Sequence, residues 1–281
     1  MKIDRILALA KSHEKKGEIN DAIQLYQSIL KAYPKNPIAI NKLKVLKATT
    51  TPKNPPSPTQ NEIDSVISLY AQGQIQESLQ ASKLLIIKYP DEAFFFYMNG
   101  VCYGCLGQFE TAVKYYQQAI ELQSDYSEAH NNLGNIYKEL EQLDSAVKCY
   151  QLAIEISPNY ADAHNNLGVA FLDLRQLDDA VQSFERALLI KPDFAEAHNN
   201  LGNTFKELDQ LESAVKCYQR ALDITPDYAD AHNNLGLTFR GLCQPDAAVK
   251  SHEQALKINP DSAEAYCYLG NVLSDLGQVD A

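Results

Sequence analysis

Paired asparagines are the residues in this chain whose type and spacing best suit binding chemistry. They recur every 34 residues within the string AHNNLG, which begins at Ala129, Ala163, Ala197 and Ala231. A carboxamide both donates and accepts hydrogen bonds, so a row of them can hold a peptide backbone without selecting its side chains. Asparagine is also a mediocre helix former, costing up to about 0.7 kcal/mol relative to alanine. Asparagines at eight positions inside predicted helices therefore need an explanation.

Three explanations for these asparagines stay open. They could bind a peptide backbone, they could bond to the neighbouring unit, or they could be shared only because the segments were recently duplicated. The candidate peptide-binding asparagines are Asn131, Asn132, Asn165, Asn166, Asn199, Asn200, Asn233, Asn234, Asn135 and Asn203. Phe94 and Tyr97 lie one helical turn apart, and we expect them to form an apolar pocket beside the row.

Two other patterns suggest reactive or metal sites, but the sequence favours packing for both. Cys102 and Cys105 form a CxxC, yet no second CxxC or nearby histidine completes a tetrahedral metal site. Histidines recur at the repeat spacing from His130 onward, where stacked helices would hold them about 8–10 Å apart, too far to share one zinc ion. Phe96 and Tyr266 occupy the same repeat position, which therefore accepts aromatic rings. The sequence predicts no catalytic residue, no metal and no cofactor.

The 34-residue period predicts one pair of helices in each unit. Within residues 127–160, Leu133, Ile136 and Leu140 recur at helical spacing. A second amphipathic stretch contains Ala146, and Pro158 ends it because proline cannot extend the hydrogen-bond ladder. Units of this size bury their apolar faces only by stacking on one another.

This alternation of small and large residues, closed by a proline, resembles the tetratricopeptide repeat (TPR) family. The resemblance implies an all-α solenoid in which antiparallel helix pairs stack into a right-handed superhelix, with the first helix of each pair on the concave side. The run EAHNNLGN also resembles the repeats of O-linked N-acetylglucosamine transferase and those that precede transferase domains in bacterial proteins, including sulfotransferases. In the former, the asparagine before Leu-Gly forms a row along a peptide-holding groove. On that pattern the row here is Asn132, Asn166, Asn200 and Asn234.

The chain is expected to contain three parts. Residues 1–48 form a helical module of one TPR-like pair and one further helix, and residues 49–60 form a linker rich in proline and threonine. Residues 61–281 form the array. It comprises a degenerate pair at 61–92, repeats at 93–126, 127–160, 161–194, 195–228 and 229–262, and a partial repeat at 263–281. The helix expected at 265–276 keeps apolar residues that need a partner, which predicts a longer natural protein or self-association through this end.

Composition indicates a cytoplasmic module that binds neither nucleic acid nor membranes. The formal net charge is −11, from 25 basic and 36 acidic residues, which argues against a nucleic-acid surface. No apolar run could span a bilayer, and six cysteines without a small-domain spacing fit free thiols in a reducing compartment. The predicted function is a non-catalytic scaffold that binds an extended peptide segment. The alternative is the substrate-recruiting arm of a glycosyltransferase or sulfotransferase.

Overall fold

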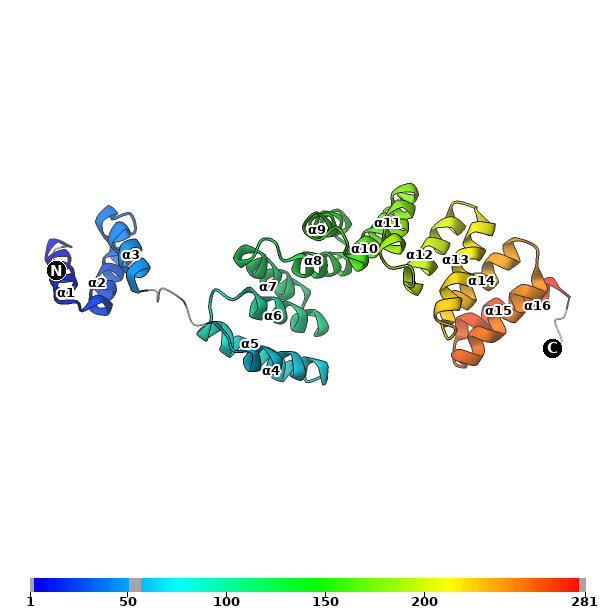
Figure 1. The fold of residues 1–281 in the computed structure, drawn as a ribbon, viewed down its shortest axis with the longest axis horizontal. Helices are drawn as coiled ribbons and strands as arrows, with labels where there is room; N and C mark the ends of the chain where they lie inside the picture. The colour runs from blue at the N-terminus through cyan, green and yellow to red at the C-terminus, as the bar shows by residue number, and fades with distance from the viewer. Residues whose placement is uncertain (1–2, 51–56, 278–281) are drawn as a thin grey trace. The chain divides into compact units, whose positions relative to one another are not determined.

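Helices account for all the regular structure in the computed structural model, which describes residues 3–50 and 57–277 (Figure 1). Sixteen helices and no strand occur among these residues. The predicted all-α fold is therefore confirmed. The chain divides into two compact units: Met1–Ser65 with Ile87–Pro90, and Val66–Ile86 with Asp91–Ala281.

The first unit contains α1 (Ile3–Lys16), α2 (Ile19–Ala32) and α3 (Pro37–Thr50). Tyr26 and Ile29 of α2 are fully buried at the centre of its core. The expected pair and additional helix are both present. Half of the predicted linker 49–60, residues 51–56, lies outside the described residues. Its first two residues belong to α3, and Gln60 begins α4 (Gln60–Ala71).

The degenerate pair consists of α4 and α5 (Ile75–Lys88), which contribute residues to both units. Ser78 and Ser82 stand on α5 where other repeats carry an alanine and an aromatic ring. Both serines are buried, and their hydroxyls donate to the backbone carbonyls of Val66 and Phe95, at 2.9 and 2.8 Å. These bonds satisfy the buried hydroxyls and connect α5 to α4 and to α6.

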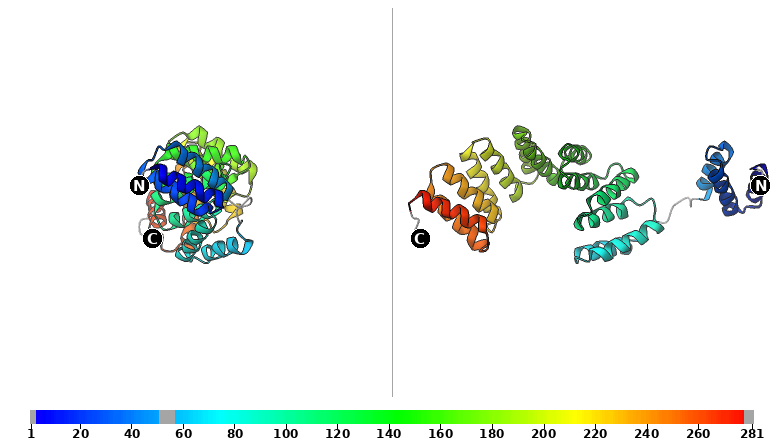
Figure 2. Two further views of the ribbon diagram at one scale, coloured as in Figure 1. Left: turned by 90° about the vertical axis from the view of Figure 1, so that its left-hand side faces the viewer. Right: turned by 180° about the vertical axis from the view of Figure 1, so that it is seen from behind.

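Five helix pairs and one further helix follow in sequence order (Figures 1 and 2). The first helices are α6 (Ala93–Cys105), α8 (Ser127–Glu139), α10 (Ala161–Asp173), α12 (Ala195–Glu207), α14 (Ala229–Gly241) and α16 (Ala263–Asp275). The second helices are α7 (Phe109–Leu122), α9 (Leu143–Ile156), α11 (Leu177–Ile190), α13 (Leu211–Ile224) and α15 (Pro245–Ile258). First helices of neighbouring pairs contact one another from α6 to α16, and no comparable contact joins consecutive second helices of the described chain. The first helices therefore line the inner side of the array.

Each pair closes around a glycine that faces an aromatic ring. A Cβ atom built on Gly134 would lie 2.6 Å from the Tyr150 ring, and one on Gly168 would lie 2.7 Å from the Phe184 ring. Real Cβ atoms do not approach other atoms this closely, so only glycine allows the two helices to pack at this distance. The sequence prediction that these glycines permit close helix approach is confirmed.

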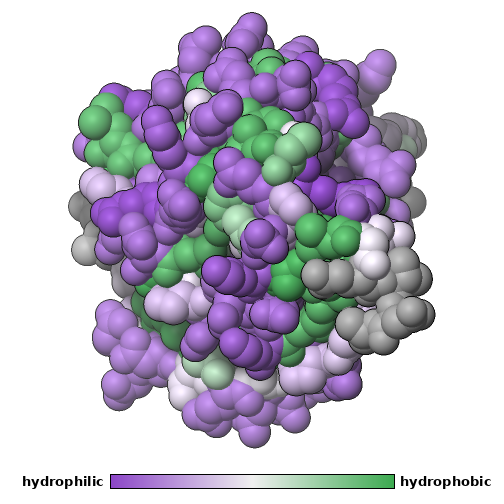
Figure 3. Space-filling model, turned by 90° about the vertical axis from the view of Figure 1, so that its right-hand side faces the viewer, coloured by the Kyte–Doolittle hydropathy of each residue, from purple (hydrophilic) through white to green (hydrophobic). Residues whose placement is uncertain are grey.

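The C-terminal end of the array leaves one face of α16 without a neighbouring pair among the described residues. Tyr266 is 57% exposed there, Leu269 and Leu273 are half-buried, and nothing lies within 4 Å of a Cβ built on Gly270. Figure 3, which views this end, shows apolar surface interrupted by polar side chains. This is the surface on which the sequence analysis expects a further partner.

Candidate functional site

The paired asparagines of α8, α10, α12 and α14 divide into two rows by burial. We call the first of each pair an inner asparagine and the second an outer asparagine. The inner asparagines, which are 2–8% exposed, are Asn131, Asn165, Asn199 and Asn233. The outer asparagines, which are half-buried, are Asn132, Asn166, Asn200 and Asn234. Only the outer row offers substantial surface to a ligand.

Hydrogen bonds connect the two rows from repeat to repeat. The Nδ2 of Asn166 donates to the Oδ1 of Asn131 in the preceding repeat, at 3.0 Å. The same bond joins Asn200 to Asn165 at 3.2 Å and Asn234 to Asn199 at 3.1 Å. The explanation that the asparagines bond to the neighbouring repeat is therefore correct for these three pairs.

These bonds also fix what the outer row can offer to a ligand. The amide nitrogens of Asn166, Asn200 and Asn234 each donate one of their two N–H groups to a neighbour, and their oxygens have no partner in the described part of the chain. A row of oxygens accepts hydrogen bonds from N–H groups. Each of these amides therefore still offers its oxygen and one N–H to a ligand, while its other N–H is used between repeats.

Asn132, at the start of the row, is bonded differently. Its Nδ2 donates to the Tyr97 hydroxyl at 3.0 Å, and its oxygen accepts from Asn131 at 3.3 Å. The Tyr97 ring lies 4.9 Å from that of Tyr126 between centroids, and burial raises the pKa of the half-buried Tyr97. Phe94 packs edge-on against the buried Phe95 ring, with centroids 5.4 Å apart. Tyr97 thus joins the row directly, through Asn132.

Asn135 and Asn203 are partners of buried tyrosines. Asn135 accepts a hydrogen bond from the Tyr150 hydroxyl, and Asn203 accepts one from the Tyr218 hydroxyl, both at 2.8 Å. In the repeat between them the ring is Phe184, which has no hydroxyl, and the residue equivalent to Asn135 is a valine. In this repeat the hydroxyl and the asparagine that would accept its hydrogen bond are both missing. Asn135 and Asn203 therefore have a structural role, which is to bond the buried tyrosine hydroxyl.

A polar pocket of about 270 Å³ gathers several of the predicted site residues at the C-terminal end of the row. It is lined by Asn199, Asn203, Asp230, Asn233, Asn234, Glu264 and Tyr268. The sequence analysis did not include the two acids. The signal that could have found them is an acid that recurs at the second position of each first helix from α8 onward, at the repeat spacing.

The histidines of α8, α10, α12 and α14 hold the loops that precede these four helices. His164 Nε2 lies 3.1 Å from the carbonyl oxygen of Pro158, and His198 Nε2 lies 3.1 Å from that of Pro192. A carbonyl only accepts, so Nε2 carries the proton. Burial is the main cause that lowers the pKa of both imidazoles, which keeps them neutral near pH 7. The sequence predicts that these histidines pack between helices. Their hydrogen bonds show in addition that they anchor the preceding loop.

Family comparison identifies the repeats. Models described as TPR repeat match residues 106–140, 134–175, 202–241 and 244–277, and models described as tetratricopeptide repeat match residues 161–194 and 6–36. The chain belongs to the tetratricopeptide repeat family. A specific similarity to the repeats of O-linked N-acetylglucosamine transferase or of bacterial transferases is not shown by these matches, and that expectation stays a prediction. No curated protein matches the chain significantly.

Solved structures of TPR proteins share the fold at low sequence identity. YrrB, described as a TPR protein with an unusual peptide-binding site, is 23% identical with a TM-score of 0.55, over 67% of this chain and 97% of its own. PilF of Pseudomonas aeruginosa is 15% identical with a TM-score of 0.67, over 76% and 96%. The Cut9–Hcn1 hetero-tetramer of the APC/C matches at 19% identity and a TM-score of 0.68, over 95% and 55%. These likenesses establish the TPR solenoid fold.

No helix among the described residues is both long and apolar enough to cross a membrane.

Proposed function

We propose that this TPR protein is a non-catalytic scaffold that holds an extended peptide segment against the inner side of its array. The observation that carries the proposal is the row of free amide oxygens on Asn166, Asn200 and Asn234. Each oxygen is held in place because the nitrogen of the same amide is bonded to the preceding repeat. Groups that are fixed before binding lose less conformational freedom when a ligand arrives.

The geometry suits a backbone better than a folded surface. Equivalent groups on neighbouring stacked helices lie roughly 8–10 Å apart, and an extended chain advances about 3.3 Å per residue. One oxygen in each repeat would therefore accept an N–H from about every third residue of the peptide. YrrB, which shares this fold, is described as having a peptide-binding site, and this agrees with such a role.

Two triple variants test the proposal, because they break the same inter-repeat bonds but differ in the groups left facing the ligand. The outer variant replaces Asn166, Asn200 and Asn234 with alanine and removes the three oxygens. The inner variant replaces Asn131, Asn165 and Asn199 with alanine, which keeps the oxygens and breaks the same three bonds together with the weaker ones from Asn131 to Asn132 and from Asn165 to Glu196. We expect both variants to melt at a lower temperature than the parent, because each loses bonds between repeats.

Peptide affinity should separate the two variants. Peptides of 15 residues, selected from a random display library on the parent protein, serve as probes in fluorescence anisotropy. The outer variant should bind them about ten- to a thousandfold more weakly, since it loses three neutral hydrogen bonds that each contribute about 0.5–1.5 kcal/mol. The inner variant keeps the oxygens but no longer holds them in place, so it should lose clearly less affinity than the outer variant. Equal losses in both variants, or none in either, would show that the asparagines only stabilise the array.

The alternative function, a substrate-recruiting arm of a transferase, uses the same groove and the same oxygens. The described residues supply no observation that favours it over a scaffold. Cytoplasmic localisation and self-association through the exposed face of α16 likewise stay predictions.

A further inference from the structure

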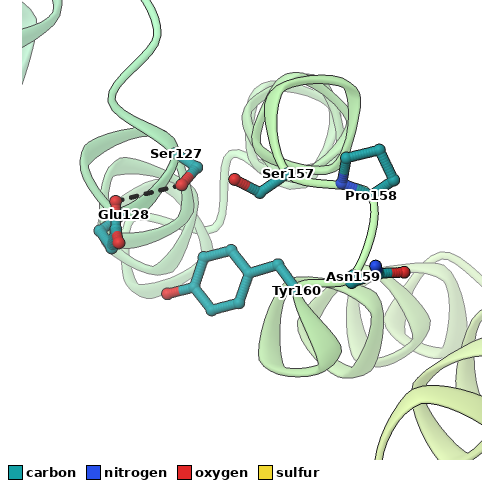
Figure 4. A pocket seen from close by; sticks show the side chains of 6 residues that line it. All are labelled: Ser127, Glu128, Ser157, Pro158, Asn159 and Tyr160. Carbon is teal, nitrogen blue, oxygen red and sulfur yellow. Dashed lines mark hydrogen bonds between the residues drawn. The ribbon is translucent and has the colours of Figure 1, made fainter.

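An open pocket lies between the start of α8 and the loop that leads into α10. It encloses about 450 Å³ and is lined by Ser127, Glu128, Ser157, Pro158, Asn159 and Tyr160. Figure 4 shows the Tyr160 hydroxyl pointing toward the side of the pocket that carries Ser127 and Glu128. The Ser127 hydroxyl donates to Glu128 Oε2 at 3.1 Å, which holds the carboxylate at the rim. A carboxylate and an aromatic ring therefore face the same open space.

The loop that carries Tyr160 is fixed from both sides. Its own amide donates to the Ser157 carbonyl at 3.1 Å, and His164 Nε2 donates to the Pro158 carbonyl at 3.1 Å. The ring is thus positioned before any ligand arrives. A site that needs no ordering on binding keeps more of its interaction energy as affinity.

The electrostatic surroundings of the ring favour a positive charge. Burial, followed by the nearby carboxylates of Asp162 and Glu128, raises the pKa of Tyr160 to about 12. Neither carboxylate forms an ion pair within the described chain. A cation placed over an aromatic face beside such acids gains from the ring quadrupole and from the charges together.

The next repeat shows what such a pocket accepts. At the positions equivalent to Ser157 and Tyr160 it has Lys191 and Phe194, and the Lys191 ammonium lies 4.6 Å from the Phe194 ring centroid. That repeat fills the space over its ring with its own lysine. The Tyr160 pocket has a short serine instead, so the corresponding space over its ring is left to an outside group.

Elsewhere in the described chain, one ammonium is held by both a carboxylate and a ring. Lys88 Nζ lies 2.7 Å from Glu62 Oε1 and 4.9 Å from the Tyr89 ring centroid. Glutamate and tyrosine together are thus a combination that this protein already uses to hold a lysine.

We propose that the pocket between Glu128 and Tyr160 binds a lysine or arginine side chain of the peptide held in the groove. This inference rests on the proposed function. Glu128 lies four residues before Asn132, and Asp162 lies four before Asn166, so each acid shares a helix face with an outer asparagine. The same backbone can therefore contact the row while its basic side chain reaches the pocket. The partner class is an extended basic peptide.

Two opposite substitutions test the pocket. Ser157→Lys places an ammonium over Tyr160, as Lys191 does over Phe194, and should block the site. Lys191→Ser removes the internal ammonium and should open a second site at Phe194. Gln182→Lys, on an exposed position of α11, is the control for the added charge. The probes are 15-residue peptides of alanine and serine with lysine, arginine or serine at every third position, measured by fluorescence anisotropy.

We expect Ser157→Lys to weaken binding of the lysine and arginine peptides roughly tenfold relative to Gln182→Lys, and Lys191→Ser to strengthen it. The serine peptide should bind more weakly and equally to all these proteins. Equal effects of Ser157→Lys and Gln182→Lys would overturn the pocket and leave only general attraction to an acidic protein. Lysine and arginine peptides that bind no more tightly than the serine peptide would overturn it as well.

The same probes separate this inference from the proposed function. If the groove holds a backbone but the pocket is wrong, the outer asparagine variant loses affinity for all three peptides and Ser157→Lys matches its control. If the pocket is right but the row is structural, Ser157→Lys weakens only the basic peptides, and the outer and inner variants bind alike.

Discussion

His252 stands at the repeat position that Tyr150, Phe184 and Tyr218 occupy in the preceding repeats. It is fully buried, its Nδ1 lies 3.2 Å from the Asn233 carboxamide oxygen, and its Nε2 is buried with no hydrogen-bond partner among the described residues. Burial, with a smaller contribution from Arg240, lowers the pKa of this imidazole to about 4. The native array therefore holds His252 neutral, while the unfolded chain would protonate it near pH 6.5.

This difference makes stability depend on pH in a defined direction. The pKa of His252 is lower in the folded protein than in the unfolded chain. Its contribution to the free energy of unfolding is therefore complete above about pH 6.5 and is lost as pH falls toward 4. At pH 5 the loss from this group is roughly 2 kcal/mol. His252→Phe would pair Gly236 with a phenylalanine, as Gly168 is paired with Phe184. It should remove this pH-dependent loss of stability. Thermal unfolding of both proteins at pH 7 and pH 5 measures it, and an equal drop in both would contradict the assignment.

At the same scale, the sequence could predict the asparagine row but not how its atoms are used. The spacing of Asn166 and Asn200 was sufficient to place them on one side of stacked helices. Their inter-repeat bonds depend on which amide atom meets which neighbour, and repeat spacing carries no information on that. The acid and ring of the pocket were missed because Glu128 and Tyr160 lie at opposite ends of the repeat 127–160 and come together only in the folded structure.

The two helices of a pair can pack closely only because a glycine on the first leaves space for the aromatic ring on the second. One pair is enough to test this. Gly168→Leu would force a side chain into the Phe184 ring and should destabilise the array by at least about 1–3 kcal/mol. Gly270→Leu is the matched control, because a Cβ there meets nothing within 4 Å. Calorimetric melting should show a lower midpoint for the first variant only. An unchanged midpoint for Gly168→Leu would refute the packing assignment.

Element boundaries follow from the sequence where the local chemistry is strong. Pro158 and Pro192 correctly predicted the ends of α9 and α11, which finish two residues earlier. The α4–α5 pair looked degenerate because Ser78 replaces a small apolar residue, yet backbone bonds hold it in the array. The turn between α8 and α9 places Glu141 at a φ of 57°, a conformation that favours glycine. Gly107 and Gly277 stand at the equivalent position in other repeats and also have positive φ, so the signal for this turn lies in those repeats and not in Glu141 itself.

For the whole molecule, composition predicts where the chain can be cut. Residues 49–60 contain one basic residue, Lys53, between prolines and threonines. We expect trypsin to cleave first after Lys53, since segments without apolar side chains to bury are preferred cleavage sites. Mass spectrometry of early fragments checks this, and Lys53→Gln should delay the cut. A first cleavage within residues 93–262 would contradict the proposed division of the chain.

The architecture was the most predictable property of the molecule, because a strict period repeats the same evidence in every unit. Four copies of AHNNLG fix the repeat length, and the glycine and aromatic positions fix the pairing of helices within it. The sequence carries no repeated signal of this kind for the identity of a ligand. In the proposed pocket, that identity would depend on single differences between repeats, such as Ser157 in one and Lys191 in the next.

The bonds between outer and inner asparagines all run backward by 35 residues, from Asn166 to Asn131, from Asn200 to Asn165 and from Asn234 to Asn199. Inserting or deleting a whole 34-residue block therefore restores the same donor and acceptor at the new junction. Recombination within the gene can lengthen or shorten the array without creating an unmatched interface. Each added block would bring one more amide oxygen, and reach about three more residues of a bound peptide. If the proposed function holds, the length of the bound segment can thus evolve independently of the hydrogen bonds that bind it.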